Sequence, residues 1–141
     1  MTYIPDRLRK LVYERAGGQC EYCLLHNEDA FPSHEIDHIF AEKHGGTTIE
    51  SNLCLSCFDC NRHKGSDIAS IDFQTNELTL LFDPRRDQWV NNFTLLGAEI
   101  QPLTSTGRVT VRLLQINSYE RLDERKILSK AGRYPHHLPN T

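Results

Sequence analysis

Two Cys-x-x-Cys pairs constrain this chain more than any other feature of its sequence. The first pair is Cys20 and Cys23, and the second pair, after 33 intervening residues, is Cys57 and Cys60. Two pairs with this spacing can converge on one tetrahedral ion, as they do in structural zinc sites. The alternative is two unrelated redox motifs, but such a motif normally opens a helix within a βαβ unit, and neither pair has that setting. We therefore expect one structural Zn²⁺ per chain, which substitutes for apolar burial in a short core.

The remaining cysteine and the composition bear on where such a protein works. Cys54 lies in an apolar run, so we expect a small buried side chain there and not a ligand. Four cysteines at metal spacing favour a reducing compartment over a disulfide scaffold. The sequence has no apolar run of membrane-span length and no charged-then-apolar leader, so we expect a cytoplasmic protein without membrane association.

Between and directly behind the cysteine pairs lies a cluster of polar residues suited to hydrolysis. Asp37 and His38 are adjacent, Asn52 follows them, and Asn61 comes directly after the last cysteine. Imidazole is the side chain whose ordinary pKa lies near neutrality, which a general base requires. The sequence has seven histidines, and His38 is distinguished from the others by these polar neighbours. We predict His38 as the proton acceptor.

In order, these residues resemble the HNH endonuclease family, in its zinc-bearing ββα-metal branch. The shared motifs are D-H-I at 37–39, G-G at 45–46, N-L at 52–53 and C-x-x-C-N-x-x-K-G at 57–65. The first cysteine pair extends the resemblance to residues 20–65, and segments 66–72, 81–89 and 107–117 look like the tail of stand-alone bacterial members. Many members carry Pro shortly after the catalytic His, where this chain has Phe40 and Ala41. We expect that difference to alter the loop and to leave the chemistry unchanged.

The resemblance implies a role for each polar residue. His38 would activate water, Asp37 and Asn61 would hold a catalytic Mg²⁺ or Mn²⁺, and Asn52 would hold the loop that aims His38. Helix geometry allows only one of Asn61 and His63 to be this ligand, because residues two apart do not share a helix face, and the resemblance implies Asn61, directly after the fourth cysteine. The implied activity is metal-dependent hydrolysis of DNA phosphodiester bonds, with RNA not excluded. One site per chain implies nicking by a monomer or double-strand cleavage by a homodimer.

The charge distribution leaves an alternative function open. The formal net charge of −3 argues weakly against a nucleic-acid partner. Basic residues gather in 1–15 and 121–133, but such runs are as often solvated helix faces as binding patches. The tentative DNA contacts are His44, Arg62 and Lys64. The alternative is therefore a non-catalytic zinc-knuckle module that binds nucleic acid or protein.

The predicted fold is α+β, with a ββα-metal core stapled by the four-cysteine zinc site. Residues 1–69 form this core with an N-terminal helix, and residues 70–141 form an α+β extension packed on the same domain. In the core we predict a helix at 5–16, strands at 34–39 and 53–55, and a helix from 61 to about 68. In the extension we predict a hairpin of 71–73 with 78–82, a short helix at 83–93, a second hairpin of 95–101 with 108–114, a last helix from 117 or 118 to about 130, and a loose end from 134.

Overall fold

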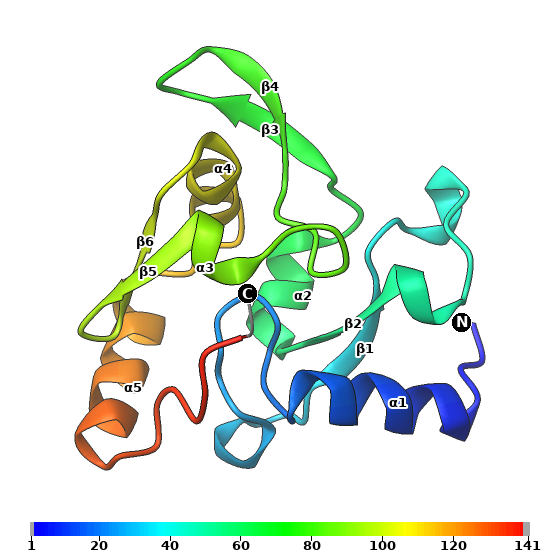
Figure 1. Cartoon of the computed structure of the whole chain (residues 1–141), viewed down its shortest axis with the longest axis horizontal. Coiled ribbons are helices and arrows are strands. Elements are labelled where there is room, and N and C mark those ends of the chain that lie inside the picture. The colour runs from blue at the N-terminus through cyan, green and yellow to red at the C-terminus, as the bar shows by residue number, and fades with distance from the viewer. Residues whose placement is uncertain (1, 140–141) are drawn as a thin grey trace.

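Two short strands and a helix follow one another in the cysteine-bearing part of the chain (Figure 1). The computed structural model describes residues 2–139. Strand β1 (Glu35–His38) pairs antiparallel with β2 (Leu53–Ser56), with Glu35 opposite Ser56 and His38 opposite Leu53. Helix α2 (Phe58–Lys64) comes directly after β2. The order β1, loop, β2, α2 is the predicted ββα arrangement.

Helix α2 begins three residues earlier than predicted, because Cys57 caps it. The Cys57 sulfur accepts a hydrogen bond from the backbone N–H of Cys60 at 3.4 Å, and the helix ends where the Gly65 N–H bonds to the Asn61 carbonyl. The predicted start at Asn61 is therefore wrong. Asn61 instead lies inside the helix, one turn before Lys64 and on the same face.

The N-terminal helix α1 (Asp6–Ala16) covers β2, as its apolar spacing predicts. Leu8 and Val12 are buried, and they belong to a small core with Leu53 and Leu55 of β2. The helix ends because Gly17 adopts the left-handed conformation, with φ of 64°, that favours glycine.

The extension begins with the first predicted hairpin, which projects from the rest of the molecule in Figure 1. Strands β3 (Ala69–Asp72) and β4 (Glu77–Leu80) pair antiparallel, and Asn76 turns the chain with φ of 58°. The buried carboxylate of Asp72 accepts two hydrogen bonds from Arg108, at 2.8 and 3.0 Å. These bonds attach the hairpin to helix α4 (Ser105–Leu113).

The second predicted hairpin is wrong in its second strand. Strand β5 (Phe93–Leu96) pairs with β6 (Glu99–Pro102), and the stretch 108–114 is not a strand but belongs mostly to α4. The Thr104 hydroxyl caps this helix by accepting a hydrogen bond from the Gly107 N–H at 3.0 Å. The predicted helix at 83–93 is also wrong, because only α3 (Trp89–Asn92) is helical there. The Asp83 carboxylate accepts backbone N–H bonds two and three residues later, which makes a turn at that point.

The last helix, α5 (Tyr119–Lys130), lies close to its predicted position, but the segment after it is not loose. Tyr134 is buried and its hydroxyl donates to the Cys23 carbonyl at 2.7 Å. Gln19 and His137 exchange two hydrogen bonds, of 3.0 and 3.1 Å. The predicted loose end is therefore wrong for residues 134–137, and residues 140 and 141 lie outside the described part.

The larger core joins the cysteines to the extension. Its buried members include Cys20, Cys23, Cys57 and Cys60 together with residues of the extension such as Trp89, Phe93, Ile100, Val109 and Leu114. The Trp89 indole N–H donates to the Tyr22 carbonyl at 2.9 Å, within the first cysteine turn. The boundary between residues 69 and 70 stays a prediction. In the described part of the chain, no helix has the length and apolar character needed to cross a bilayer.

Candidate metal and nuclease site

The sulfur atoms of the four paired cysteines meet at one point in the core. They lie within 4.8 Å of one another, and all four residues are buried. The Cys23 and Cys57 sulfurs are 3.6 Å apart. Four thiolates placed tetrahedrally at about 2.3 Å from Zn²⁺ would be roughly 3.8 Å apart, so this group fits zinc.

Both cysteine pairs use the same local turn to present their sulfurs. The backbone N–H of Cys23 donates to the Cys20 sulfur at 3.5 Å, and the N–H of Cys60 donates to the Cys57 sulfur at 3.4 Å. Cys54 lies outside the cluster, fully buried, and burial raises the pKa of its thiol. As predicted, Cys54 is a small buried side chain; a thiol held protonated is a poor nucleophile and a poor metal ligand.

One residue at the zinc cluster was missed by sequence reasoning. Arg121 of α5 donates from Nη2 to the Cys60 sulfur at 2.9 Å. Burial alone would lower the pKa of Arg121, but the thiolates of Cys60, Cys23 and Cys57 outweigh it and raise that pKa. In the sequence this arginine is one of several basic residues in a run, and no local signal marks it.

Asp37, a predicted ligand of the catalytic cation, lies largely buried beside Lys64. The Lys64 ammonium is 3.4 Å from Asp37 Oδ2 and donates to the His38 carbonyl at 3.3 Å. The Lys64 side chain is only 2% exposed, so its expected contact with flanking phosphates is wrong. Burial raises the pKa of Asp37, and the charge of Lys64 opposes that rise. Among the described residues, Asp37 Oδ2 is buried and accepts no hydrogen bond, so the Lys64 ammonium is its charged partner in this structure.

Asn61 lies on the face of α2 that is turned to β1. Its amide donates to the Glu35 carboxylate, while Lys64, one turn later, reaches Asp37. Glu35 and Asp37 are two residues apart on β1 and share one side of the strand. Glu35, Asp37 and Asn61 therefore bring carboxylate and amide oxygens together, and these are the ligands that Mg²⁺ and Mn²⁺ prefer. His63 lines a different cavity, against the first turn of α5.

His38 is the last residue of β1 and lies beside an open groove. Its Nε2 is 2.9 Å from the Thr48 hydroxyl, which comes from the loop between the strands. The groove has a volume of about 450 Å³, and its lining includes Arg9, His34 and Glu35. Thr48 was not predicted as a site residue; its signal in the sequence is a hydroxyl two residues after the Gly-Gly pair.

Asn52 closes the loop between β1 and β2. Its side chain accepts from the Phe40 N–H at 2.9 Å and donates to the carbonyls of Phe40 and Thr47, at 3.0 and 2.9 Å. A Cβ at Gly46 would overlap the Phe40 carbonyl oxygen, so only glycine allows this close approach. Three side-chain bonds and one glycine therefore hold the loop closed behind His38.

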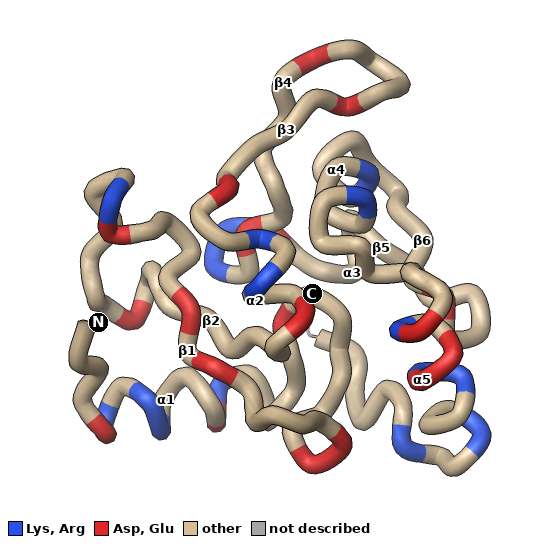
Figure 2. Tube along the Cα trace, turned by 180° about the vertical axis from the view of Figure 1, so that it is seen from behind, with Lys and Arg blue, Asp and Glu red and all other residues tan. Residues whose placement is uncertain are grey.

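Basic and acidic residues are mixed along the first and last helices of the described chain. His44 and Arg62 are exposed, and their contacts with DNA stay predictions. In the C-terminal basic run, Arg125 is buried, and the exposed Arg133 pairs with Asp29 at 2.7 Å, so both already have partners in the fold. Figure 2 shows Lys and Arg interspersed with Asp and Glu along α1 and α5.

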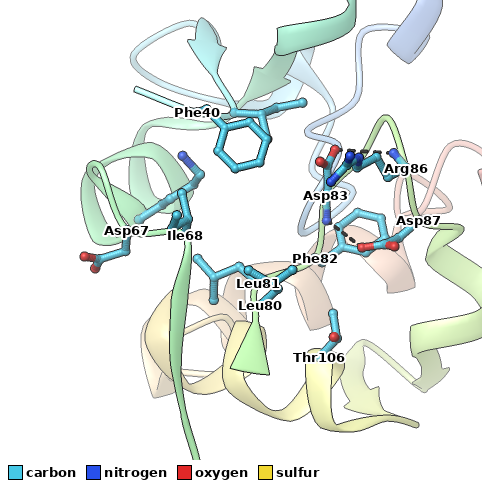
Figure 3. A pocket seen from close by; sticks show the side chains of 12 residues that line it. Phe40, Asp67, Ile68, Leu80, Leu81, Phe82, Asp83, Arg86, Asp87 and Thr106 are labelled. Carbon is cyan, nitrogen blue, oxygen red and sulfur yellow. Dashed lines mark hydrogen bonds between the residues drawn. The ribbon is translucent and has the colours of Figure 1, made fainter. Parts of the chain in front are cut away.

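A small pocket lies where the loop after β1 meets the extension (Figure 3). Its volume is about 140 Å³, and Phe40, Ile68 and Phe82 supply apolar walls, while Asp83 and Arg86 lie at one side. Phe40 stands near the position where many HNH proteins carry Pro. The Phe40 side chain is partly buried and packs against the larger core, which includes Leu81 and Phe82 of the extension.

Comparisons with known proteins agree with this geometry. Residues 20–67 match the family model described as HNH endonuclease. Neither the curated proteins nor the solved structures give a match to the chain. The family match indicates nuclease activity and metal binding, and the matched segment contains all four zinc-site cysteines together with Asp37, His38 and Asn61. The resemblance to the HNH endonuclease family that the motifs predicted is therefore found over residues 20–67.

Proposed function

We propose that this protein is a metal-dependent endonuclease that hydrolyses DNA phosphodiester bonds, with His38 as the general base. The observation that carries the proposal is the position of His38 at the open end of β1, bonded to Thr48 and facing the groove. A base in such a groove can reach both a water molecule and a phosphate, which a buried histidine cannot.

The orientation of the ring defines which nitrogen takes the proton. In the proposed mechanism, Nε2–H of His38 donates to the Thr48 hydroxyl, so the lone pair of the neutral ring is on Nδ1. Nδ1 accepts a proton from water as the water oxygen attacks phosphorus. The bond to the 3′-oxygen then breaks, and that oxygen takes a proton from a solvent water molecule, which leaves a 5′-phosphate and a 3′-hydroxyl end.

Asp37 and Asn61 would hold the catalytic Mg²⁺ or Mn²⁺ in this proposal. When bound, such a cation stabilises the extra negative charge on the phosphate oxygens and on the leaving oxygen. Lys64 favours the ionised form of Asp37, since its ammonium is 3.4 Å from the carboxylate. The Asn52 bonds hold the loop that carries Thr48, and so they keep His38 aimed at the groove.

The groove holds one cationic side chain that can meet a phosphate backbone, beside the carboxylates of Glu35 and Glu42. Arg9 of α1 lines it, and its guanidinium is directed by a hydrogen bond from Nε to the Ile4 carbonyl at 3.0 Å. We propose that Arg9 contacts a phosphate beside the scissile one. With one His38 per chain, a monomer would cut one strand, and double-strand cleavage would need two copies.

Plasmid nicking tests this function. Supercoiled plasmid is incubated with zinc-loaded protein and Mn²⁺ or Mg²⁺, and relaxed product is measured with wild type, His38→Ala and the matched control His63→Ala. We expect nicking by wild type and His63→Ala, and none by His38→Ala at unchanged zinc content and unfolding temperature. Nicking by His38→Ala at the wild-type rate would remove His38 from the mechanism.

The alternative is a zinc module that binds nucleic acid without cutting it. The observation that favours it is the mixed charge of the surface with a net charge of −3, which suits weak binding better than an extended DNA footprint. DNA retention by wild type without nicking under any divalent cation would select this alternative.

A further inference from the structure

Helix α5 reaches the zinc cluster through one buried arginine. Arg121 Nη2 donates to the Cys60 sulfur at 2.9 Å and lies 3.8 Å from the Cys57 sulfur. Its Nη1 donates to the carbonyls of Leu114 and Gln115, at 2.7 and 3.2 Å, and these bonds fix the orientation of the guanidinium group. The side chain is only 11% exposed.

The charge at the cluster needs a cation of this kind. Four thiolates around one Zn²⁺ leave a formal charge of −2, and all four cysteines are buried. Among residues 2–139, Arg121 is the only side chain apart from the cysteines themselves that hydrogen-bonds a sulfur of the cluster. Hydrogen bonds from a charged donor are stronger than neutral ones, and they gain further strength where water is excluded.

We infer that Arg121 is a positioning residue of the zinc centre, which holds the Cys60 and Cys57 thiolates in place and balances part of their charge. Arg121 lies outside residues 20–67, the segment that matches the family. Zinc retention by the HNH segment therefore depends on a helix of the extension. This inference concerns the zinc site alone and holds whether or not the proposed DNA cleavage occurs.

A purely structural role for Arg121 must be separated from this one. Arg121 also caps the end of α4, so its loss would loosen the extension. Arg125, one turn later on α5, is the matched control, because it is buried and donates to the carbonyls of Ala98 and Ile116, at 3.0 and 2.8 Å. Arg125 donates to no sulfur among the described contacts, so its loss would loosen the same helix without touching the thiolates.

The test compares zinc affinity across Arg121→Gln, Arg121→Lys and Arg125→Gln in the full-length, zinc-loaded protein. Zinc transfer to a chromophoric chelator is measured well below the unfolding temperature of each variant. We expect Arg121→Gln to bind zinc about 10- to 100-fold more weakly, as is typical when a group that orients metal ligands is removed. Arg121→Lys should recover part of that loss, since it keeps the charge but not the planar fork. Arg125→Gln should unfold at lower temperature with unchanged zinc affinity.

Two results would overturn the inference. One is wild-type zinc affinity in Arg121→Gln, and the other is an equal loss of affinity in Arg125→Gln. If Arg121→Gln does not fold, Arg121→Lys decides the question against Arg125→Lys. We then expect a several-fold loss of zinc affinity only in Arg121→Lys, and wild-type affinity in that variant would overturn the inference.

Discussion

Replacing Asn52 by alanine should uncouple the loop behind His38 from the rest of the protein. The substitution removes three hydrogen bonds, two to Phe40 and one to Thr47. At about 1 kcal/mol for each bond, the free energy of unfolding should fall by about 3 kcal/mol. For a chain of this length, such a loss lowers the unfolding temperature by roughly 10 °C.

The extension offers a matched control for this substitution. Asn117 bonds both the N–H and the carbonyl of Ile100, at 3.1 and 2.7 Å, just as Asn52 bonds both groups of Phe40. Asn117 also accepts a hydrogen bond from Arg125 Nη2 at 2.7 Å, so Asn117→Ala removes three bonds as well and should cost a similar amount of stability. Its loop lies outside the HNH segment, so we expect cleavage per folded molecule to stay near the wild-type value.

The assay pairs chemical unfolding of the zinc-loaded variants with plasmid nicking at a temperature where both remain folded. We expect Asn52→Ala to nick about 100-fold more slowly than Asn117→Ala, because a small misplacement of a catalytic group costs about that much. Equal nicking by the two variants would refute the reasoning, since stability alone would then explain the effect of Asn52.

Three further predictions concern the metal sites and the buried lysine. Cys57→Ser should lose zinc and much of the fold, whereas Cys54→Ser should keep one zinc per chain by elemental analysis; zinc lost only from the Cys54 variant would contradict the ligand set. Asn61→Ala should cripple nicking and Asn61→His should shift the metal preference toward Co²⁺ or Ni²⁺, and normal cleavage by Asn61→Ala in Mg²⁺ would contradict its role. Lys64→Met should lower the free energy of unfolding by about 3 kcal/mol, because it leaves a buried carboxylate without its cation; unchanged urea unfolding would show that this pair does not stabilise the fold.

The parts of the fold that could be predicted are those that local sequence encodes. Cysteine spacing defines each zinc turn within four residues, and apolar spacing places Leu8 and Val12 on one face of α1. The hairpin at Asn76 is likewise local, because its turn residue adopts the left-handed conformation that asparagine tolerates. Each of these features depends on neighbours within one turn or one hairpin.

Helix α4 could not be predicted because its determinants lie far away in sequence. Its stretch from 108 to 112, with Val109, Thr110 and Val111, has the β-branched composition typical of a strand. In the structure the Thr110 hydroxyl donates to the Thr106 carbonyl at 2.7 Å and accepts from the Phe82 N–H at 2.8 Å. This buried contact with a residue 28 positions away outweighs the local preference, as tertiary packing commonly does.

Contacts from distant residues also hold the end of β1, where Asp37 and His38 point to opposite sides of the strand. Asp37 and His38 alternate across β1, so neither the strand nor the loop alone fixes both of them. Lys64 connects them, because its ammonium lies near the Asp37 carboxylate, at 3.4 Å, and donates to the His38 carbonyl, at 3.3 Å. Thr48 then holds the His38 ring from the loop side, at 2.9 Å. Lys64, which the sequence placed at the DNA surface, thus holds the end of the strand that carries both the proposed base, His38, and the proposed metal ligand, Asp37. Lys64→Met should therefore slow nicking more than its loss of stability alone predicts.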